Sequence, residues 1–166
     1  NHMSNNDIQQ QTTVNIQEKA NLIWAIADKL VGVYKPHEYG NVILPMCVIK
    51  RFEDTLAPTK EKVLATNEKL DKDGIVVKKG FLESAAEQKF YNLSPFDFQK
   101  LLNDPENIKV NFESYLNHFS DNVIDIIHRM DFDREIEKMA DNGVLYLVIK
   151  EFCTPKAYLG ADQITS

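Results

Sequence analysis

Basic and aromatic side chains gather in two neighbouring stretches of the sequence, and these residue types are suited to binding. They are Lys29, Lys35, His37, Tyr39, Lys50 and Arg51. Lysine and arginine contact the phosphates of nucleic acids or the carboxylates of an acidic partner. The alternative is an ordinary solvated helix end, where the helix dipole favours lysine. These six residues are therefore the candidate contacts to DNA or to a partner.

Residues of catalytic types are present, but not in the spacing of an active site. The glycines are isolated, so no Gly-rich loop can cradle a phosphate. His37, His118 and His128 are far apart and no Cys-x-x-Cys pair occurs, which argues against a metal site. The acidic pair Glu53-Asp54 is expected on a polar helix face. We predict no catalytic residue, no cofactor-binding residue and no metal ligand within residues 1–166.

Composition indicates a single water-soluble domain. The chain has 166 residues, a formal net charge of -6 and 43% hydrophobic residues. An acidic surface repels phosphate, which disfavours strong binding of nucleic acid by the chain alone but leaves room for a local basic strip. No apolar run reaches the roughly 18 residues that span a membrane, and no secretory signal is visible, so we expect a cytoplasmic protein. Cys47 and Cys153 are expected to be reduced and buried.

Apolar residues recur every three to four positions in the first half, which predicts helices. The first helix is expected from Thr12 to Tyr34, with Trp24 and Val31 widening its apolar stripe. The second is a core helix from Leu44 to Leu56 with Pro45 in its first turn. A surface helix follows Pro58. Residues 75–77 are β-prone and are expected as a loop or a small hairpin arm.

Capping residues divide the second half of the chain. Ser94-Pro95 and Asp104-Pro105 each place a cap residue before a proline, which predicts two helix starts. Apolar stripes predict further helices over residues 108–119, 123–130 and 133–140. The last segment, residues 144–152, would also suit a strand, but we predict a helix.

These patterns predict an all-α fold, a compact multi-helix domain of about seven to nine helices with no significant sheet. Residues 1–11 are expected to comprise a tag remnant and a disordered N-terminus. Residues 12–155 form the helical domain, and residues 156–166 form a linker or tail.

Two stretches closely resemble the opening of the modification subunit of type I restriction–modification systems. They run from Leu22 to Gly40 and from Val42 to Asp54. The shared pattern is a Trp helix, Asp-Lys-Leu-x-Gly, a Glu-Tyr-Gly turn and an Ile-Leu-Pro helix that closes in Arg-Phe. The resemblance covers residues 13 to 153. Val31 is a departure, because the family often carries Arg there, and its loss weakens the case for DNA contact.

The resemblance implies a non-catalytic N-terminal helical domain that serves subunit assembly and closure around DNA. The whole subunit of this family methylates adenine in DNA with S-adenosylmethionine. Its partners are a specificity subunit, a second modification subunit, a restriction subunit and DNA. The family's catalytic motif is Asn-Pro-Pro-(Tyr/Phe), and no proline of this chain follows an asparagine. We expect the catalytic domain to lie beyond these residues.

An independent helical interaction module unrelated to DNA is the alternative. The residues that follow Ser166 in the natural reading frame distinguish the two hypotheses. The DNA sequence that is recognised would belong to the specificity subunit, and the residues of this chain do not specify it.

Overall fold

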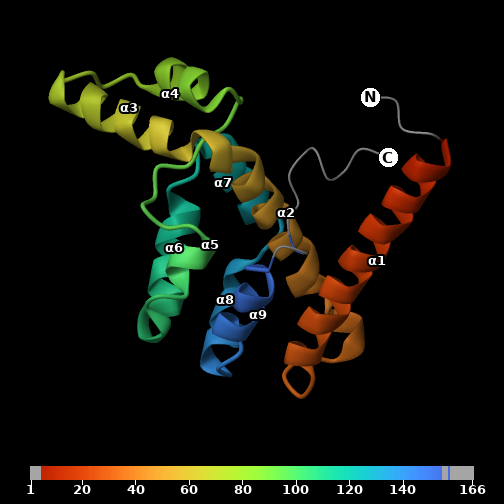
Figure 1. Ribbon diagram of the computed structural model, residues 1–166. Coiled ribbons are helices and arrows are strands. Elements are labelled where there is room, and N and C mark those ends of the chain that lie inside the picture. Colours follow the sequence, from red (N-terminus) through yellow and green to blue (C-terminus); the bar gives the residue numbers. More distant parts are fainter. Residues whose placement is uncertain (1–4, 155–156, 158–166) are drawn as a thin grey trace.

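The computed structural model describes residues 5–154 and residue 157. The chain forms helices α1 to α9, in agreement with the helical spacing of its apolar side chains (Figure 1). No strand occurs among these residues, where only the isolated bridges Val31–Tyr34 and Asn92–Phe119 are found. The predicted all-α class is confirmed. The expected tail at residues 156–166 lies almost wholly outside the described residues.

The helices follow one another with short connections. In chain order they are α1 (Asn5–Leu30), α2 (Gly40–Leu56), α3 (Lys60–Lys72), α4 (Lys79–Ala86), α5 (Phe98–Leu101), α6 (Ile108–Asn117), α7 (Asp121–Arg129), α8 (Asp133–Asp141) and α9 (Leu145–Glu151). Short 3-10 turns precede α2, α3 and α6: η1 (Pro36–Glu38), η2 (Ala57–Thr59) and η3 (Pro105–Asn107).

Helix α1 differs from its prediction at both ends. It begins at Asn5, before the predicted start at Thr12. A helix that has nucleated extends readily through glutamines, which have good helix propensity. It ends at Leu30 rather than Tyr34, because Gly32 adopts a φ of 86° and turns the backbone.

The predicted widening of the apolar stripe by Trp24 and Val31 is wrong. Leu22, Ile26 and Leu30 are buried at i, i+4 spacing, whereas Trp24 is 72% exposed and Val31 is exposed as well. The helix has apolar residues on two faces, and packing against α2 and α9 selects one of them.

Helix α2 begins at Gly40, before the predicted start at Leu44. The carbonyl of Tyr39 accepts hydrogen bonds from the N–H groups of Val42 and Ile43, so the turn η1 leads directly into the helix. Pro45 is consequently inside the helix and buried, beyond the first turn where it was expected.

The dipeptide Ser94-Pro95 does not begin a helix, and that prediction is wrong. Helix α5 begins at Phe98, and the Asp97 carboxylate caps it by accepting the Lys100 N–H at 2.7 Å. Ser94 is fully buried, and its hydroxyl oxygen accepts the Phe96 N–H in a local turn. The remaining predicted helices are present, and residues 144–152 form a helix, as expected.

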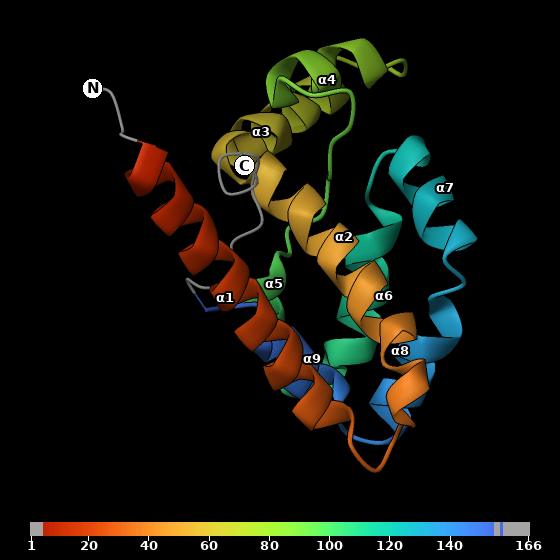
Figure 2. The same cartoon turned by 90° about the vertical axis from the view of Figure 1, so that its right-hand side faces the viewer.

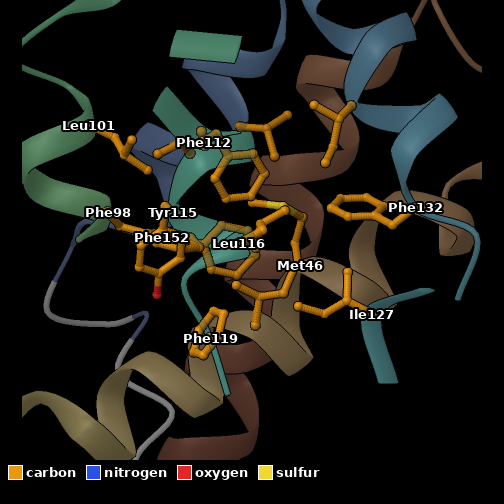
Figure 3. Packing of buried hydrophobic residues seen from close by; sticks show 14 of the residues in the cluster. Met46, Phe98, Leu101, Phe112, Tyr115, Leu116, Phe119, Ile127, Phe132 and Phe152 are labelled. Carbon is orange, nitrogen blue, oxygen red and sulfur yellow. The ribbon is translucent and has the colours of Figure 1, made fainter. Parts of the chain in front are cut away.

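An aromatic core holds α2, α5, α6 and α9 together, and Figure 3 shows its rings lying close to one another. The Phe98 ring makes edge-to-face contacts with Phe112, Tyr115 and Phe152 at centroid distances of 5.9 to 6.1 Å. Such geometry adds roughly 0.5–1.5 kcal/mol per pair to the effect of burial. We call α1, α2 and α5 to α9 the body.

Helices α3 and α4 form a separate hairpin, which we call the arm (Lys60–Ala86). The two helices pack chiefly on each other and extend away from the body in both views (Figures 1 and 2). Leu82, Ala85 and Ala86 of α4 are buried, as are Val63 and Leu70 of α3. The β-prone residues 75–77 lie in the irregular connection at its tip, so the expectation of a loop is confirmed over that of a strand.

Candidate functional site

Four of the six predicted contact residues lie where α1 turns into α2. Lys35 and His37 are exposed on this turn, and Tyr39 is half-buried. Lys29 is half-buried, and its ammonium lies 3.8 Å from the Glu151 carboxylate of α9. Lys35 and His37 therefore offer their side chains to a partner, while Lys29 already has an acidic neighbour.

Contacts with α8 and within the turn itself hold this turn in place. The Tyr34 hydroxyl donates to the Glu135 carboxylate at 3.1 Å, and the Lys138 ammonium lies 4.3 Å from the centre of the Tyr34 ring. Burial and the Glu135 charge raise the pKa of Tyr34 well above its usual value, so it stays a neutral donor. The Glu38 carboxylate accepts the Lys35 N–H at 2.8 Å. These contacts fix the backbone that presents Lys35 and His37.

Arg51 is exposed, but it lies well away from that turn. It is eleven residues after the first residue of α2, which at the helical rise corresponds to roughly 16 Å along the helix. The exposed candidate residues are therefore separated, with Lys35 and His37 on the turn before α2 and Arg51 on α2 itself. A long polyanion such as a DNA backbone spans this distance more readily than a single small anion.

Lys50 departs from the predicted surface role. It is only 8% exposed, and its ammonium donates to Asp54 at 2.6 Å and lies 3.8 Å from Glu53. The same ammonium lies 5.7 Å from the centre of the Phe98 ring. Lys50 is therefore part of the interior, and its neighbour Arg51 is the member of the pair that faces outward.

Glu53 is the centre of a buried polar group that we call the Glu53 cluster: Lys50, Glu53, Asp54, Lys60, Asn92 and Tyr115. One carboxylate oxygen of Glu53 accepts both the Phe98 N–H and the Tyr115 hydroxyl at 2.9 Å. Burial raises the pKa of Glu53 to about 7, although the Lys50 charge and these two hydrogen bonds oppose the rise. One side chain thus joins α2 to α5 and α6.

Lys60 extends the cluster to the base of the arm. Its ammonium donates to the Asn92 side chain at 3.0 Å and to the Phe96 carbonyl at 3.3 Å, and it lies over the Tyr115 ring. Burial lowers the pKa of Lys60 to about 8, partly offset by the Glu53 and Asp97 charges. Asn92 in turn donates to the Tyr115 carbonyl at 3.1 Å. The arm is attached to the body through these contacts.

A pocket of about 290 Å³ opens beside the Glu53 cluster. Its walls combine the carboxylates of Glu53 and Asp97 with the ammonium of Lys60, above the apolar side chains of Leu56 and Pro58. The pocket is therefore lined by side chains of both acidic and basic types. The arrangement serves to connect helices, and it does not single out an anion or a cation as ligand.

Sequence reasoning assigned Glu53-Asp54 to a polar helix face, and this is wrong for both residues. Asp54 is buried and Glu53 faces the core. The spacing Ile49, Glu53, Leu56 is an i, i+4, i+7 series, so one face carries all three residues. Reading α2 by that series would have placed Glu53 inside the body.

The cysteines and other potential ligand residues lie apart. Cys47 and Cys153 are free and half-buried, and burial raises the pKa of each thiol to about 11. Within residues 5–154 and 157, no group of three histidine, cysteine or acidic side chains has the geometry to hold a metal ion. Nor does any helix of that part of the chain have the length and apolarity needed to cross a membrane.

Comparison with known proteins gives one family. Residues 19–152 match the model of the HsdM N-terminal domain, and this span includes the C-terminal part of α1 and all of α2 to α9. Neither the curated proteins nor the solved structures include a significant match. The chain belongs to the HsdM N-terminal domain family, the N-terminal part of the modification subunit of type I restriction–modification systems.

Proposed function

We propose that this chain is a non-catalytic assembly domain of a methyltransferase subunit and that it helps the assembled complex close around DNA. The observation that carries the proposal is the family match over residues 19–152, which contains nearly the whole body and the complete arm. The parent subunit would transfer a methyl group from S-adenosylmethionine to adenine through a catalytic domain of its own.

The contacts to DNA would come from exposed cations on the outside of the body. Lys35 and His37 are exposed on the turn before α2, and Arg51 is exposed on α2 itself. Lys50 is not part of this surface, because the Glu53 cluster binds its ammonium inside the body. A net charge of -6 keeps the domain from binding DNA tightly alone, so the contacts would act within a larger complex.

The proposed partners follow from the same assignment. The domain would pack beside the subunit's catalytic domain and would meet the specificity subunit, a second modification subunit and the restriction subunit. Trp24 on α1 and Val31 directly after it are exposed apolar side chains that a partner subunit could cover.

The test uses the assembled modification complex with both Lys35 and Arg51 replaced by alanine. Each lost phosphate contact should lower the slope of log affinity against log salt by about one unit. Affinity for DNA should fall at low salt, while methylation with saturating DNA stays unchanged. Lys89→Ala is the matched control, because Lys89 is also exposed but lies outside the proposed surface.

Two results would contradict the proposal. An unchanged salt slope in the double variant would remove these cations from the DNA contact. A natural reading frame that ends without an Asn-Pro-Pro-(Tyr/Phe) motif would favour an independent helical interaction module.

A further inference from the structure

The tip of the arm exposes an unusual number of apolar side chains. Val76 is 88% exposed and Val77 is 81% exposed, and Phe81 is also largely exposed at the start of α4. Isolated exposed apolar residues are ordinary, but two adjacent valines at the end of a projecting hairpin have no packing role within the domain. Figure 1 shows this connection at the far end of the arm from the body.

The backbone of the two valines is open as well. Among the described residues, neither Val76 nor Val77 makes a backbone hydrogen bond, whereas Ile75 N–H donates to the Leu70 carbonyl and anchors the start of the segment. β-Branched residues favour extended backbone. An exposed segment with free N–H and C=O groups can pair with another chain, as the edge of a sheet does.

The charges around the valines have a definite order. Asp71, Lys72 and Asp73 precede them, and Lys78 and Lys79 follow. The Lys72 ammonium lies 3.4 Å from the Glu68 carboxylate within α3, so the preceding side is acidic on balance. Lys78 binds Asp71 within the same arm, but Asp73 and Lys79 are exposed and make no ion pair within the described part of the chain. If two such segments lay antiparallel, the acidic end of one would meet the basic end of the other. A parallel pair would place like charges together.

We propose that the arm tip is a self-complementary docking segment that pairs antiparallel with the same segment of a second copy of this chain. The pair is centred between Val76 and Val77, so that Val76 of each copy lies opposite Val77 of the other. Asp73 of each copy then approaches Lys79 of the other. Backbone hydrogen bonds supply attraction, and the order of charges selects the antiparallel direction.

The contact area sets the expected strength. A few residues from each copy bury far less than the roughly 1,200 Å² of a stable interface, so the isolated chain should dimerise weakly. Two copies held in one complex would have a high effective concentration, which favours the same contact. That last step alone rests on the proposed function, and the dimer of the isolated chain does not.

The test measures the mass of the full 166-residue chain by sedimentation equilibrium up to millimolar concentration, at low and high salt. We expect a monomer–dimer equilibrium that weakens with salt. Val77→Asp should raise the dimer dissociation constant about ten-fold, because symmetry removes two valine pairs at once. Val110→Asp is the control, since Val110 is an exposed valine on α6 of the body and its replacement should leave the dimer intact.

Charge reversal tests the direction of pairing. Asp73→Lys and Lys79→Asp should each weaken the dimer a few-fold, and the double variant should recover it. Circular dichroism verifies that each variant remains folded. A chain that is monomeric at every concentration, or a dimer that Val77→Asp leaves unchanged, would overturn the proposal. A double charge-reversal variant that dimerises no better than the single variants would also overturn it.

Discussion

The body and the arm use the same kind of helix but are stabilised differently. In the body, the Phe98 ring is surrounded by three other aromatic rings from α6 and α9. In the arm, α4 contributes Leu82 and two alanines against one face of α3, and the outer surfaces of both helices face solvent. Stability therefore need not be uniform, and the arm has far fewer buried apolar atoms per residue with which to resist local opening.

The junction between them combines polar contacts with apolar ones, since the buried side chains of the arm belong to the same hydrophobic cluster as those of the body. Lys60 binds Asn92 and the Phe96 carbonyl, and the Phe52 and Phe90 rings meet edge to face at 5.1 Å. The Thr59 hydroxyl donates to the Ala86 carbonyl at 3.1 Å. The arm is thus attached at its base, whereas its tip is free.

The largest effect is expected from removing the central ring of the body. Phe98→Ala should lower the free energy of unfolding by about 3–5 kcal/mol, because a fully buried aromatic ring leaves a cavity among three others. Urea denaturation followed by circular dichroism measures this loss. A loss below about 1 kcal/mol would show that the aromatic core is not what distinguishes the body.

Replacing the neighbouring cations Lys50 and Arg51 of α2 should have very different effects on the free energy of unfolding. Lys50→Ala removes the buried ammonium that pairs with Asp54 and lies beside Glu53, which should cost about 3 kcal/mol. Arg51→Ala is the matched control and should change the free energy of unfolding by less than about 0.5 kcal/mol, because the side chain is exposed. Equal effects for the two variants would disprove the inward placement of Lys50.

Replacing a buried residue of the arm should destabilise mainly the arm itself. Leu82→Ala should cost about 2 kcal/mol, since Leu82 is the largest buried side chain of α4. Hydrogen exchange should accelerate in α3 and α4 while amides of α6 and α9 keep their protection. Uniform acceleration in all helices would mean that arm and body unfold as one unit.

The last prediction concerns the pH dependence of the junction. The pKa of Glu53 is raised to about 7 in the folded chain, so the folded state holds a proton that the unfolded state releases. The contribution of Glu53 is therefore most favourable below its ordinary pKa and is lost as pH rises toward 7. In Glu53→Gln, whose amide oxygen can still accept both hydrogen bonds, this loss should be absent.

Denaturation at a series of pH values from 4.5 to 8 measures that difference. The free energy of unfolding of the original chain should fall relative to Glu53→Gln across this interval. Parallel curves would show that Glu53 has an ordinary pKa and that the cluster does not bury its charge.

Much of the fold could be predicted because local rules determine it. Asp104-Pro105 leads into the turn before α6, and Gly143 at a φ of 72° follows α8. Errors arose where local signals were ambiguous. Ser94-Pro95 has the form of a helix start, yet a turn formed by Asn92 and Ser94 uses those groups instead. The sequence did not show which of the candidate contact residues are buried. Lys50 and Arg51 are adjacent cations, yet only Arg51 is exposed.

The sequence by itself determined that this chain forms helices and which family it belongs to, since helical periodicity, capping residues and a specific motif are local properties of the chain. Only the tertiary structure decided which apolar face of α1 is buried and that Lys50 and Glu53 lie inside. It also separated the arm from the body. Burial depends on what lies across from a side chain, and the helices that lie across are distant in sequence.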